Sequence, residues 1–137
     1  MDVHNKAVRS YNMSRIRSTD TKPEIAVRQF LFSKGFRFRK NDRRYPGHPD
    51  IVLPKYRTII FINGCFWHAH EGCSDFSFPK SNTDFWKKKL LQNRKRDAKI
   101  YRELTNLGWK VIVIWQCELK KSLFQERMNN LTEQIVR

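Results

Sequence analysis

The sequence predicts a single α/β domain with elements in the order α-β-β-β-α-β-α. Short β-branched runs, such as residues 58–62 and 110–115, read as buried strands, and capped stretches with helical spacing lie before, between and after them. The 137 residues are enough to bury a core, and the chain shows no repeat, low-complexity tract or Gly/Ser linker. We therefore expect one domain over residues 1–137.

The first helix is predicted to begin at Thr21. The stretch from Thr21 to Glu24 fits a capping box, with Pro23 in the first turn and a stop signal at Gly35. Glu24 then lies in the first turn. Residues 1–18 precede this helix as an arm in which cations alternate with apolar side chains, a mixture suited to a DNA groove. Composition alone favours the simpler interpretation of a frayed terminus.

Three short strands are predicted next. Residues 36–39 alternate as a half-buried strand does, and residues 51–53 and 58–62 are β-branched runs joined by a tight connection at 54–56. The last two strands should therefore form a hairpin. Antiparallel pairing brings Asp50, at the entrance of one strand, next to the loop that leaves the other.

The second half of the chain predicts a long basic helix, a strand and a final helix. The long helix should run from a cap around Asn82 to about residue 107, with Gly108 ending it. Its candidate core contacts are Phe85, Leu90, Ile100, Leu104 and Leu107. A buried strand over 110–115 and a helix from about residue 121 complete the fold.

The charge balance indicates a polyanionic partner. The chain carries 28 Lys and Arg against 13 Asp and Glu, a formal net charge of +15, with a pI near 10.2. No apolar run approaches the roughly 20 residues of a spanning helix, and the N-terminus lacks the apolar region of a signal peptide. We expect a cytoplasmic protein without membrane contact, whose three cysteines are free or bound to metal.

Metal-ligand and aromatic side chains crowd together just after the predicted strand at 58–62. A closed tetrahedral zinc site needs four thiolate or imidazole ligands, and one such set uses every cysteine of the chain. Its members are Cys65, His70, Cys73 and Cys117. The zinc would join the loop to the end of the last strand. The alternative is that the three cysteines are small buried hydrophobic residues.

His68 is separated from this ligand set by its position. Two residues before His70 in an extended loop, it should face the opposite way, towards Asp50. An imidazole can take a proton from water, and a carboxylate can hold a Mg²⁺ that bridges a scissile phosphate. This pair suits phosphodiester hydrolysis. Alternatively, His68 supports a zinc ligand and Asp50 forms a turn.

Large aromatic side chains lie among the cations. Phe66 and Trp67 directly precede His68, and Trp86 begins the lysine-rich helix. Cations neutralise phosphates, and planar rings can stack on bases or separate a base step. The simpler interpretation is a solvated basic helix, with Trp109 and Trp115 as ordinary core residues. The excess of cations favours nucleic-acid binding.

Several of these segments occur together in one known family. They are Pro46-Gly47-His48-Pro49-Asp50, Gly64-Cys65-Phe66-Trp67-His68, Phe85-Trp86, Asn93-Arg94-Lys95-Arg96-Asp97, Gly108-Trp109 and Trp115-Gln116-Cys117-Glu118. From about Val3 to Glu118, the chain resembles the very-short-patch-repair (Vsr-like) mismatch endonucleases. The resemblance implies a restriction-endonuclease-like fold, with a central mixed sheet flanked by helices. It also implies nicking of duplex DNA on the 5′ side of the thymine in a T·G mismatch left by deamination of 5-methylcytosine.

The same resemblance implies a role for particular residues. Asp50 would bind Mg²⁺ near Glu24, His68 would activate water, and zinc would be structural. The residues implied to contact DNA are Met13 and Ile16 of the arm, Phe66, Trp67, Trp86, Lys89 and Asn93. The implied partners are T·G-mismatched duplex DNA and, through function, a cytosine-5 DNA methyltransferase and repair factors.

Two positions depart from the familiar pattern. A well-known member has Thr-His where this chain has Ile62-Asn63; the main-chain carbonyl of Ile62 can still face the magnesium, but Asn63 cannot titrate. We expect a slower rate and an unchanged reaction class. Two alternatives stay open: a restriction-type or recombination nuclease acting on unmodified DNA, and a non-catalytic, zinc-stabilised DNA-binding module.

Overall fold

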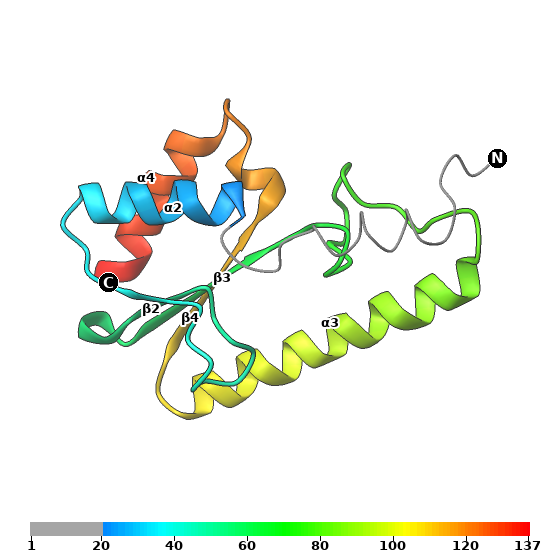
Figure 1. The fold of residues 1–137 in the computed structure, drawn as a ribbon, viewed down its shortest axis with the longest axis horizontal. Helices are drawn as coiled ribbons and strands as arrows, with labels where there is room; N and C mark the ends of the chain where they lie inside the picture. Colours follow the sequence, from blue (N-terminus) through cyan, green and yellow to red (C-terminus); the bar gives the residue numbers. More distant parts are fainter. Residues whose placement is uncertain (1–20) are drawn as a thin grey trace, which may run out of the picture.

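The computed structural model describes residues 21–137, in which a mixed four-stranded sheet has helices on both faces (Figure 1). The strands are β1 (Arg39–Lys40), β2 (Ile51–Leu53), β3 (Thr58–Asn63) and β4 (Lys110–Trp115), in that order across the sheet. β1–β2 and β2–β3 pair antiparallel, and β3–β4 pair parallel. The predicted α/β class, mixed sheet and hairpin are confirmed.

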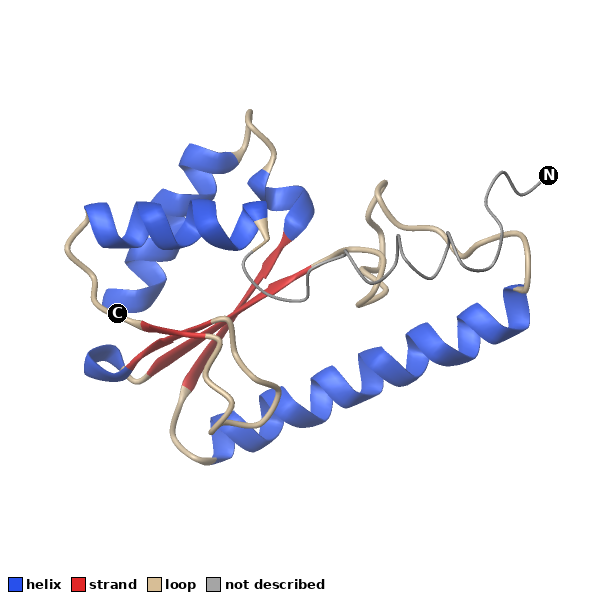
Figure 2. Cartoon of the chain, in the orientation of Figure 1, coloured by secondary structure: helices blue, strands red, loops and turns tan. Residues whose placement is uncertain are grey.

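Within residues 21–137, three helices cover this sheet, and Figure 2 colours them blue. They are α2 (Lys22–Ser33), α3 (Thr83–Asn106) and α4 (Phe124–Val136), and two short 3₁₀ turns, Pro54–Tyr56 and Gln116–Leu119, follow β2 and β4. The 24-residue α3 is the crossover between the parallel strands β3 and β4. Its N-terminal half continues past the end of the sheet (Figure 1).

Alternating side chains of β3 divide the core into two layers. Ile60 packs with Val27 of α2 and Leu131 of α4, whereas Phe61 packs with Leu104 of α3. This period-two alternation is what a strand buried on both faces requires. The sheet is therefore fixed from both sides, and the ends of β2 and β3 have a defined position.

The predicted helix signals hold at α2. The Thr21 side chain accepts a hydrogen bond from the Glu24 N–H at 3.5 Å, Pro23 lies in the first turn, and Gly35 follows the helix with φ +90°. The prediction for 36–39 is largely wrong, because only Arg39 of that range belongs to β1. Phe36 instead donates its N–H to the Leu31 carbonyl and packs its ring against Tyr56. Pairing with β2 therefore begins only at Arg39.

Three details of the second half also differ from expectation. Phe85 and Leu107 were predicted in the core but are 59% and 61% exposed. Phe85 lies in the N-terminal half of α3, which extends beyond the sheet, and Leu107 is the C-cap at the other end of the helix. The final helix begins at Phe124 rather than near residue 121, since the preceding residues form a turn closed by hydrogen bonds to the Lys120 carbonyl.

No helix within residues 21–137 combines the length and apolar character needed to cross a membrane. The arm over residues 1–18, with Met13 and Ile16, lies outside the described residues.

Candidate functional site

Asp50 lies at the open end of the β2–β3 hairpin, opposite the connecting turn. Its Oδ2 accepts a hydrogen bond from the Ile62 N–H at 2.6 Å. In a strand the N–H and C=O of one residue point to the same side, so the Ile62 carbonyl also faces the Asp50 edge. The structure thus brings the carboxylate and the main-chain carbonyl to one edge of the sheet, where a hard cation finds oxygen ligands.

The environment of Asp50 disfavours its charge. Burial raises the pKa of this carboxyl to about 7, and the nearby Glu24 carboxylate raises it further; the bond from Ile62, His68 and Arg28 act in the opposite direction. Glu24 is itself buried, with an Arg28 nitrogen 3.4 Å from its carboxylate. Two desolvated carboxylates beside each other form a site that a divalent cation would stabilise.

The loop after β3 separates His68 from His70, but not by the predicted mechanism. Residues 64–70 are not extended: the N–H groups of His68, Ala69 and His70 bond back to Gly64, Phe66 and Cys65. Between the two histidines, Ala69 has a left-handed φ of +50° and is 1% exposed. A non-glycine residue in this conformation costs about 1 kcal/mol. After this turn the two imidazoles have different partners: His68 meets Asp97 and His70 meets Cys117, although both rings lie beside Trp115, at 6.4 and 3.9 Å between centroids.

His68 is held by a residue that the sequence did not single out. Its Nδ1 lies 2.5 Å from Oδ2 of Asp97 on α3. An ionised carboxylate can only accept, so Nδ1–H donates, and in the neutral imidazole Nε2 then carries the free lone pair. The arrangement leaves a nitrogen that can accept a proton. One signal pointed to Asp97: it is the single acid between Asp84 and Glu103 on a basic helix, one turn after Asn93.

Asn63 is buried beneath the same region. Its Nδ2 donates to the Tyr101 hydroxyl at 2.7 Å, and Tyr101 packs its ring on Phe61 at 5.1 Å. Burial raises the pKa of Tyr101 to about 12, and Asp97 and Asp50 add to this effect. Tyr101 therefore remains a neutral phenol at working pH, and Asn63 is a fixed hydrogen-bonding group rather than an acid or base.

The four predicted zinc ligands meet in one place. The ligand atoms of Cys65, His70, Cys73 and Cys117 all lie within 4.8 Å of one another, and His70 Nδ1 is 3.5 Å from Cys117 Sγ. The His70 ring stacks on Trp115 at 3.9 Å between centroids, with an interplanar angle of 3°. Trp115 therefore orients a ligand, in addition to its place in β4.

The chemistry of this donor set fits a metal. Burial and the neighbouring thiols raise the pKa of Cys117 to about 12, and burial also raises the pKa of Cys65. Three crowded thiols resist ionisation unless a cation is present, and a coordinating thiol is deprotonated outright. The Cys₃His set can hold a structural zinc.

The aromatic side chains form one continuous group beside His68. Phe66, Trp67 and Trp86 contact one another with ring centroids 5.1 to 6.0 Å apart, and Trp67 is 40% exposed. Phe76 backs Phe66 at 6.3 Å. These rings come from the loop and from the start of α3, and their exposed parts are available to a partner.

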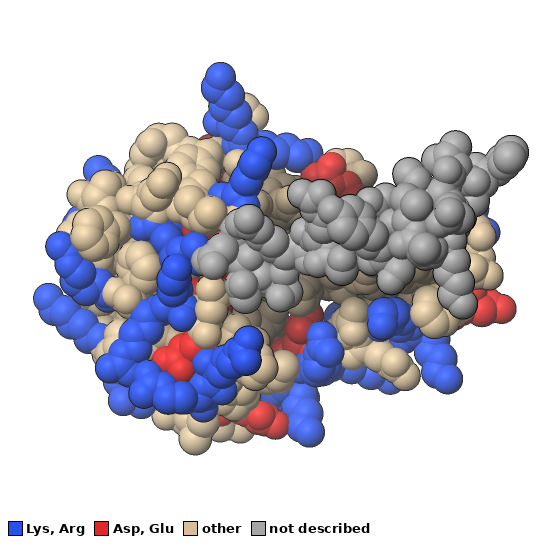
Figure 3. Space-filling model, in the orientation of Figure 1, with Lys and Arg blue, Asp and Glu red and all other residues tan. Residues whose placement is uncertain are grey.

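Lys89 and Asn93 have different surroundings. Lys89 is exposed on α3, whereas the Asn93 amide donates to the Trp67 carbonyl at 3.1 Å. Lys and Arg side chains cover much of the face drawn in Figure 3, where acidic groups are few and separate. Exposed cations on α3 include Lys87, Lys88, Lys95, Arg96 and Lys99.

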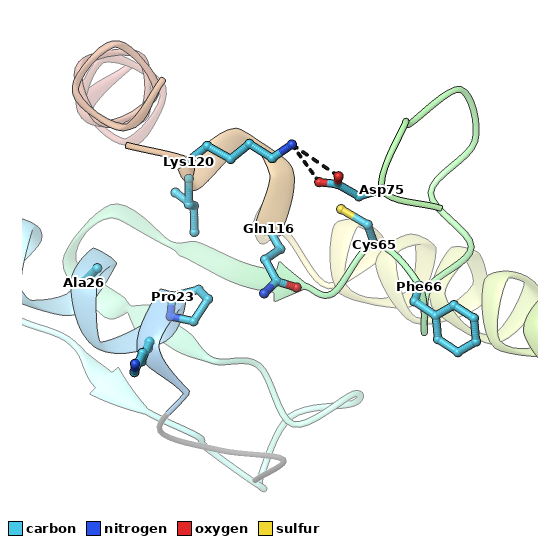
Figure 4. A pocket seen from close by; sticks show the side chains of 9 residues that line it. Pro23, Ala26, Cys65, Phe66, Asp75, Gln116 and Lys120 are labelled. Atoms are coloured by element: carbon cyan, nitrogen blue, oxygen red, sulfur yellow. Dashed lines mark hydrogen bonds and ion pairs between the residues drawn. The ribbon is translucent and has the colours of Figure 1, made fainter. Parts of the chain in front are cut away.

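Two clefts border the site. One of about 270 Å³ is lined by His68, Asp97, Tyr101 and Arg94, between the loop and α3. A larger one of about 530 Å³ lies between the start of α2, the Cys65 region and the turn after β4, with the Lys120–Asp75 ion pair across it (Figure 4). The larger cleft contains neither Asp50 nor His68.

Comparisons with known proteins agree on one family. The sequence profile described as DNA mismatch endonuclease Vsr matches residues 1–75. The type II nicking enzyme V.NmeAIP of Neisseria meningitidis serogroup A is 53% identical over 135 residues, 98% of this chain and 96% of that protein. The DNA mismatch endonuclease Vsr of Escherichia coli is 43% identical over 119 residues, 87% and 76% of the two chains. V.XorIIP of Xanthomonas oryzae, another type II nicking enzyme, is 44% identical over 126 residues.

Proposed function

We infer the specific reaction of this site from one premise: the chain belongs to the DNA mismatch endonuclease Vsr family. Membership makes the protein a DNA endonuclease and confirms the predicted restriction-endonuclease-like fold. We propose that it nicks duplex DNA on the 5′ side of the thymine in a T·G mismatch. Such mismatches arise by deamination of 5-methylcytosine, so its partner activity would be a cytosine-5 DNA methyltransferase followed by repair factors.

The observation that supports this proposal most is that Asp50 is bonded to the end of β3 and lies near enough to His68 for the His68 charge to lower the pKa of Asp50. Asp50 and the Ile62 carbonyl would hold Mg²⁺, and Glu24 would bind water around it. A bound Mg²⁺ would supply charge neutralisation at the scissile phosphate. The raised pKa of Asp50, which burial causes, fits a carboxylate whose charge is balanced only when a cation arrives.

His68 and Asp97 would activate the attacking water. Nε2 of His68 takes a proton as the water oxygen bonds to phosphorus and the bond to the leaving sugar oxygen breaks. Asp97 fixes the tautomer and stabilises the imidazolium that forms. Asn63 would donate to a phosphate or to a water molecule, while Tyr101 keeps its amide in place.

The aromatic group supports a preference for mismatches. A T·G wobble is less well stacked than a matched pair, and unstacking a matched step takes a few kcal/mol. Phe66, Trp67 and Trp86 entering the duplex would therefore encounter a lower cost at the mismatch. Lys89 and Asn93 would face the mismatched pair, and Met13 and Ile16 would approach from the other groove. The exposed Lys89 side chain can contact the base pair directly. Asn93 would have to break its hydrogen bond to the Trp67 carbonyl or contact the bases through its other amide hydrogen and its oxygen.

One experiment tests the proposal directly. The zinc-loaded protein is incubated with end-labelled T·G and matched duplexes of several flanking sequences, with and without Mg²⁺, and any nick is mapped. We expect a Mg²⁺-dependent nick 5′ of the mismatched thymine, absent in Asp50→Asn. Equal cleavage of matched and mismatched DNA would indicate a restriction-type nuclease, and binding without cleavage would indicate a non-catalytic module.

A further inference from the structure

The loop residues on both sides of His68 are attached to α3 through their backbone carbonyls. Asn93 donates to the Trp67 carbonyl at 3.1 Å, and Nη2 of Arg94 donates to the Ala69 carbonyl. Asp97, one turn further along the same helix, holds the His68 ring. Three positions of one rigid helix thus fix three consecutive residues of the loop.

Ala69 is the residue of this loop that most needs support. Its φ of +50° is unfavourable for a side chain with a Cβ, and its side chain is buried. A conformation of this kind persists only where the surroundings determine it. Arg94 supplies such a determinant, because its guanidinium binds the carbonyl of the strained residue itself.

We propose that Arg94 is a positioning residue for the reaction: by holding the Ala69 carbonyl it keeps the left-handed turn that directs His68 towards Asp97 and His70 towards the thiol cluster. The simplest competing role is that of a phosphate-binding cation. The geometry favours positioning, because the Arg94 side chain reaches inward to a carbonyl and lines the cleft with His68. Arg102, by contrast, is exposed on the same helix, and its side chain makes no hydrogen bond or ion pair within residues 21–137.

The inference rests on the proposed function for its kinetic test, so the experiment also includes a measurement that needs no turnover. Nicking of a T·G duplex is measured for Arg94→Ala and for the charge-matched control Arg102→Ala, with zinc content determined for each. We expect kcat to fall about 10- to 100-fold in Arg94→Ala, as for a displaced catalytic group, with KM and zinc content little changed. Arg102→Ala should retain the wild-type kcat.

Glycine at position 69 provides the decisive second variant. Because glycine adopts positive φ without a steric penalty, Ala69→Gly in the Arg94→Ala background should recover most of the lost kcat. An increase of KM alone in Arg94→Ala, matched by Arg102→Ala, would overturn the proposal in favour of a phosphate contact. Failure of Ala69→Gly to restore kcat would equally overturn it.

Arg94→Lys covers the case in which Arg94→Ala loses zinc or fails to fold. Lysine keeps the charge but cannot match the planar donor geometry, so its kcat should be intermediate and should rise when Ala69→Gly is added. No response to Ala69→Gly in this background would contradict the role of the turn.

The ¹⁵N spectrum of the His68 side chain distinguishes failure of the proposed function from failure of the proposed role of Arg94. The Nδ1–H signal of the Asp97 bond should be present in the wild type, lost in Arg94→Ala and restored by Ala69→Gly. If this pattern appears but wild-type protein nicks no T·G duplex, the proposed function fails and the role of Arg94 stands. If nicking occurs and the signal is unaffected by Arg94→Ala, the role of Arg94 fails.

Discussion

Replacing Asp50 with asparagine should remove nicking and stabilise the protein in the absence of Mg²⁺. Burial raises the pKa of Asp50 from the ordinary 3.8 to about 7, so the folded state prefers the protonated, neutral carboxyl. The unfolded chain loses this proton first as the pH rises. The free energy of unfolding should therefore fall between about pH 4 and pH 7 and level off above pH 7. Asparagine resembles the neutral carboxyl, and its oxygen can still accept the bond from Ile62.

The size of the effect follows from the two pKa values. The difference between 3.8 and about 7 corresponds to about 4 kcal/mol at pH 8. Because the side chain is only partly shielded from water, about 2 kcal/mol is a reasonable expectation after screening. For a domain of this size, that is a rise in Tm of about 8 °C. Asp50→Ala should gain less, since it also leaves the Ile62 N–H without its acceptor.

Thermal unfolding of the zinc-loaded protein, in buffers from pH 4.5 to pH 8 without Mg²⁺, provides the assay. The difference in Tm between Asp50→Asn and the wild type should be smallest at the acidic end and largest at pH 8. Added Mg²⁺ should raise the Tm of the wild type but not that of Asp50→Asn. Glu133→Gln, which removes an exposed carboxylate of α4, should show little difference at any pH. A difference in Tm between Asp50→Asn and the wild type that does not depend on pH would refute a desolvated carboxyl at Asp50.

Three further outcomes follow from the site. Cys117→Ser should lose zinc and unfold at a lower temperature, and so should Cys65→Ser; full zinc content in either variant, measured by mass spectrometry, would exclude that ligand. Trp67→Ala should reduce the ratio of T·G to matched nicking more than it reduces zinc content, and an unchanged ratio would contradict insertion of this ring into the duplex. Asp97→Asn should lower kcat about 10- to 100-fold with little change in KM, since it weakens the bond that orients His68; a wild-type rate would remove Asp97 from the mechanism.

Sequence patterns were sufficient wherever the relevant constraint is local or is repeated along the chain. The β-branched runs predicted β2, β3 and β4, and the tight connection between the first two predicted the hairpin that places Asp50 beside Ile62. Ligand chemistry predicted the Cys₃His cluster, although Cys117 is 44 residues from Cys73, because few other side chains bind zinc.

The sequence did not predict the contacts between α3 and the loop. Asp97, Arg94 and Asn93 act on residues 25 to 29 positions earlier, through a helix whose rotation about its axis is set by packing of Leu90 and Leu104. No local pattern encodes that rotation. Alternation in an extended loop was expected to turn His68 away from His70; the loop instead forms a turn with left-handed Ala69, and the two imidazoles differ in their bonding partners while both lie beside Trp115.

These contacts support the loop from two sides, and the two supports are coupled through the turn at Ala69. The thiol and imidazole ligands hold residues 65, 70 and 73 from one side, and α3 holds residues 67 to 69 from the other. The left-handed conformation of Ala69 can persist because contacts on both sides together offset its conformational free energy. Loss of zinc and loss of the Arg94 contact should therefore be strongly non-additive in their effect on His68: either one loosens the turn that the other needs. In the proposed mechanism, DNA distortion by Trp67 would therefore be coupled to the position of the neighbouring His68 imidazole, because α3 holds both residues.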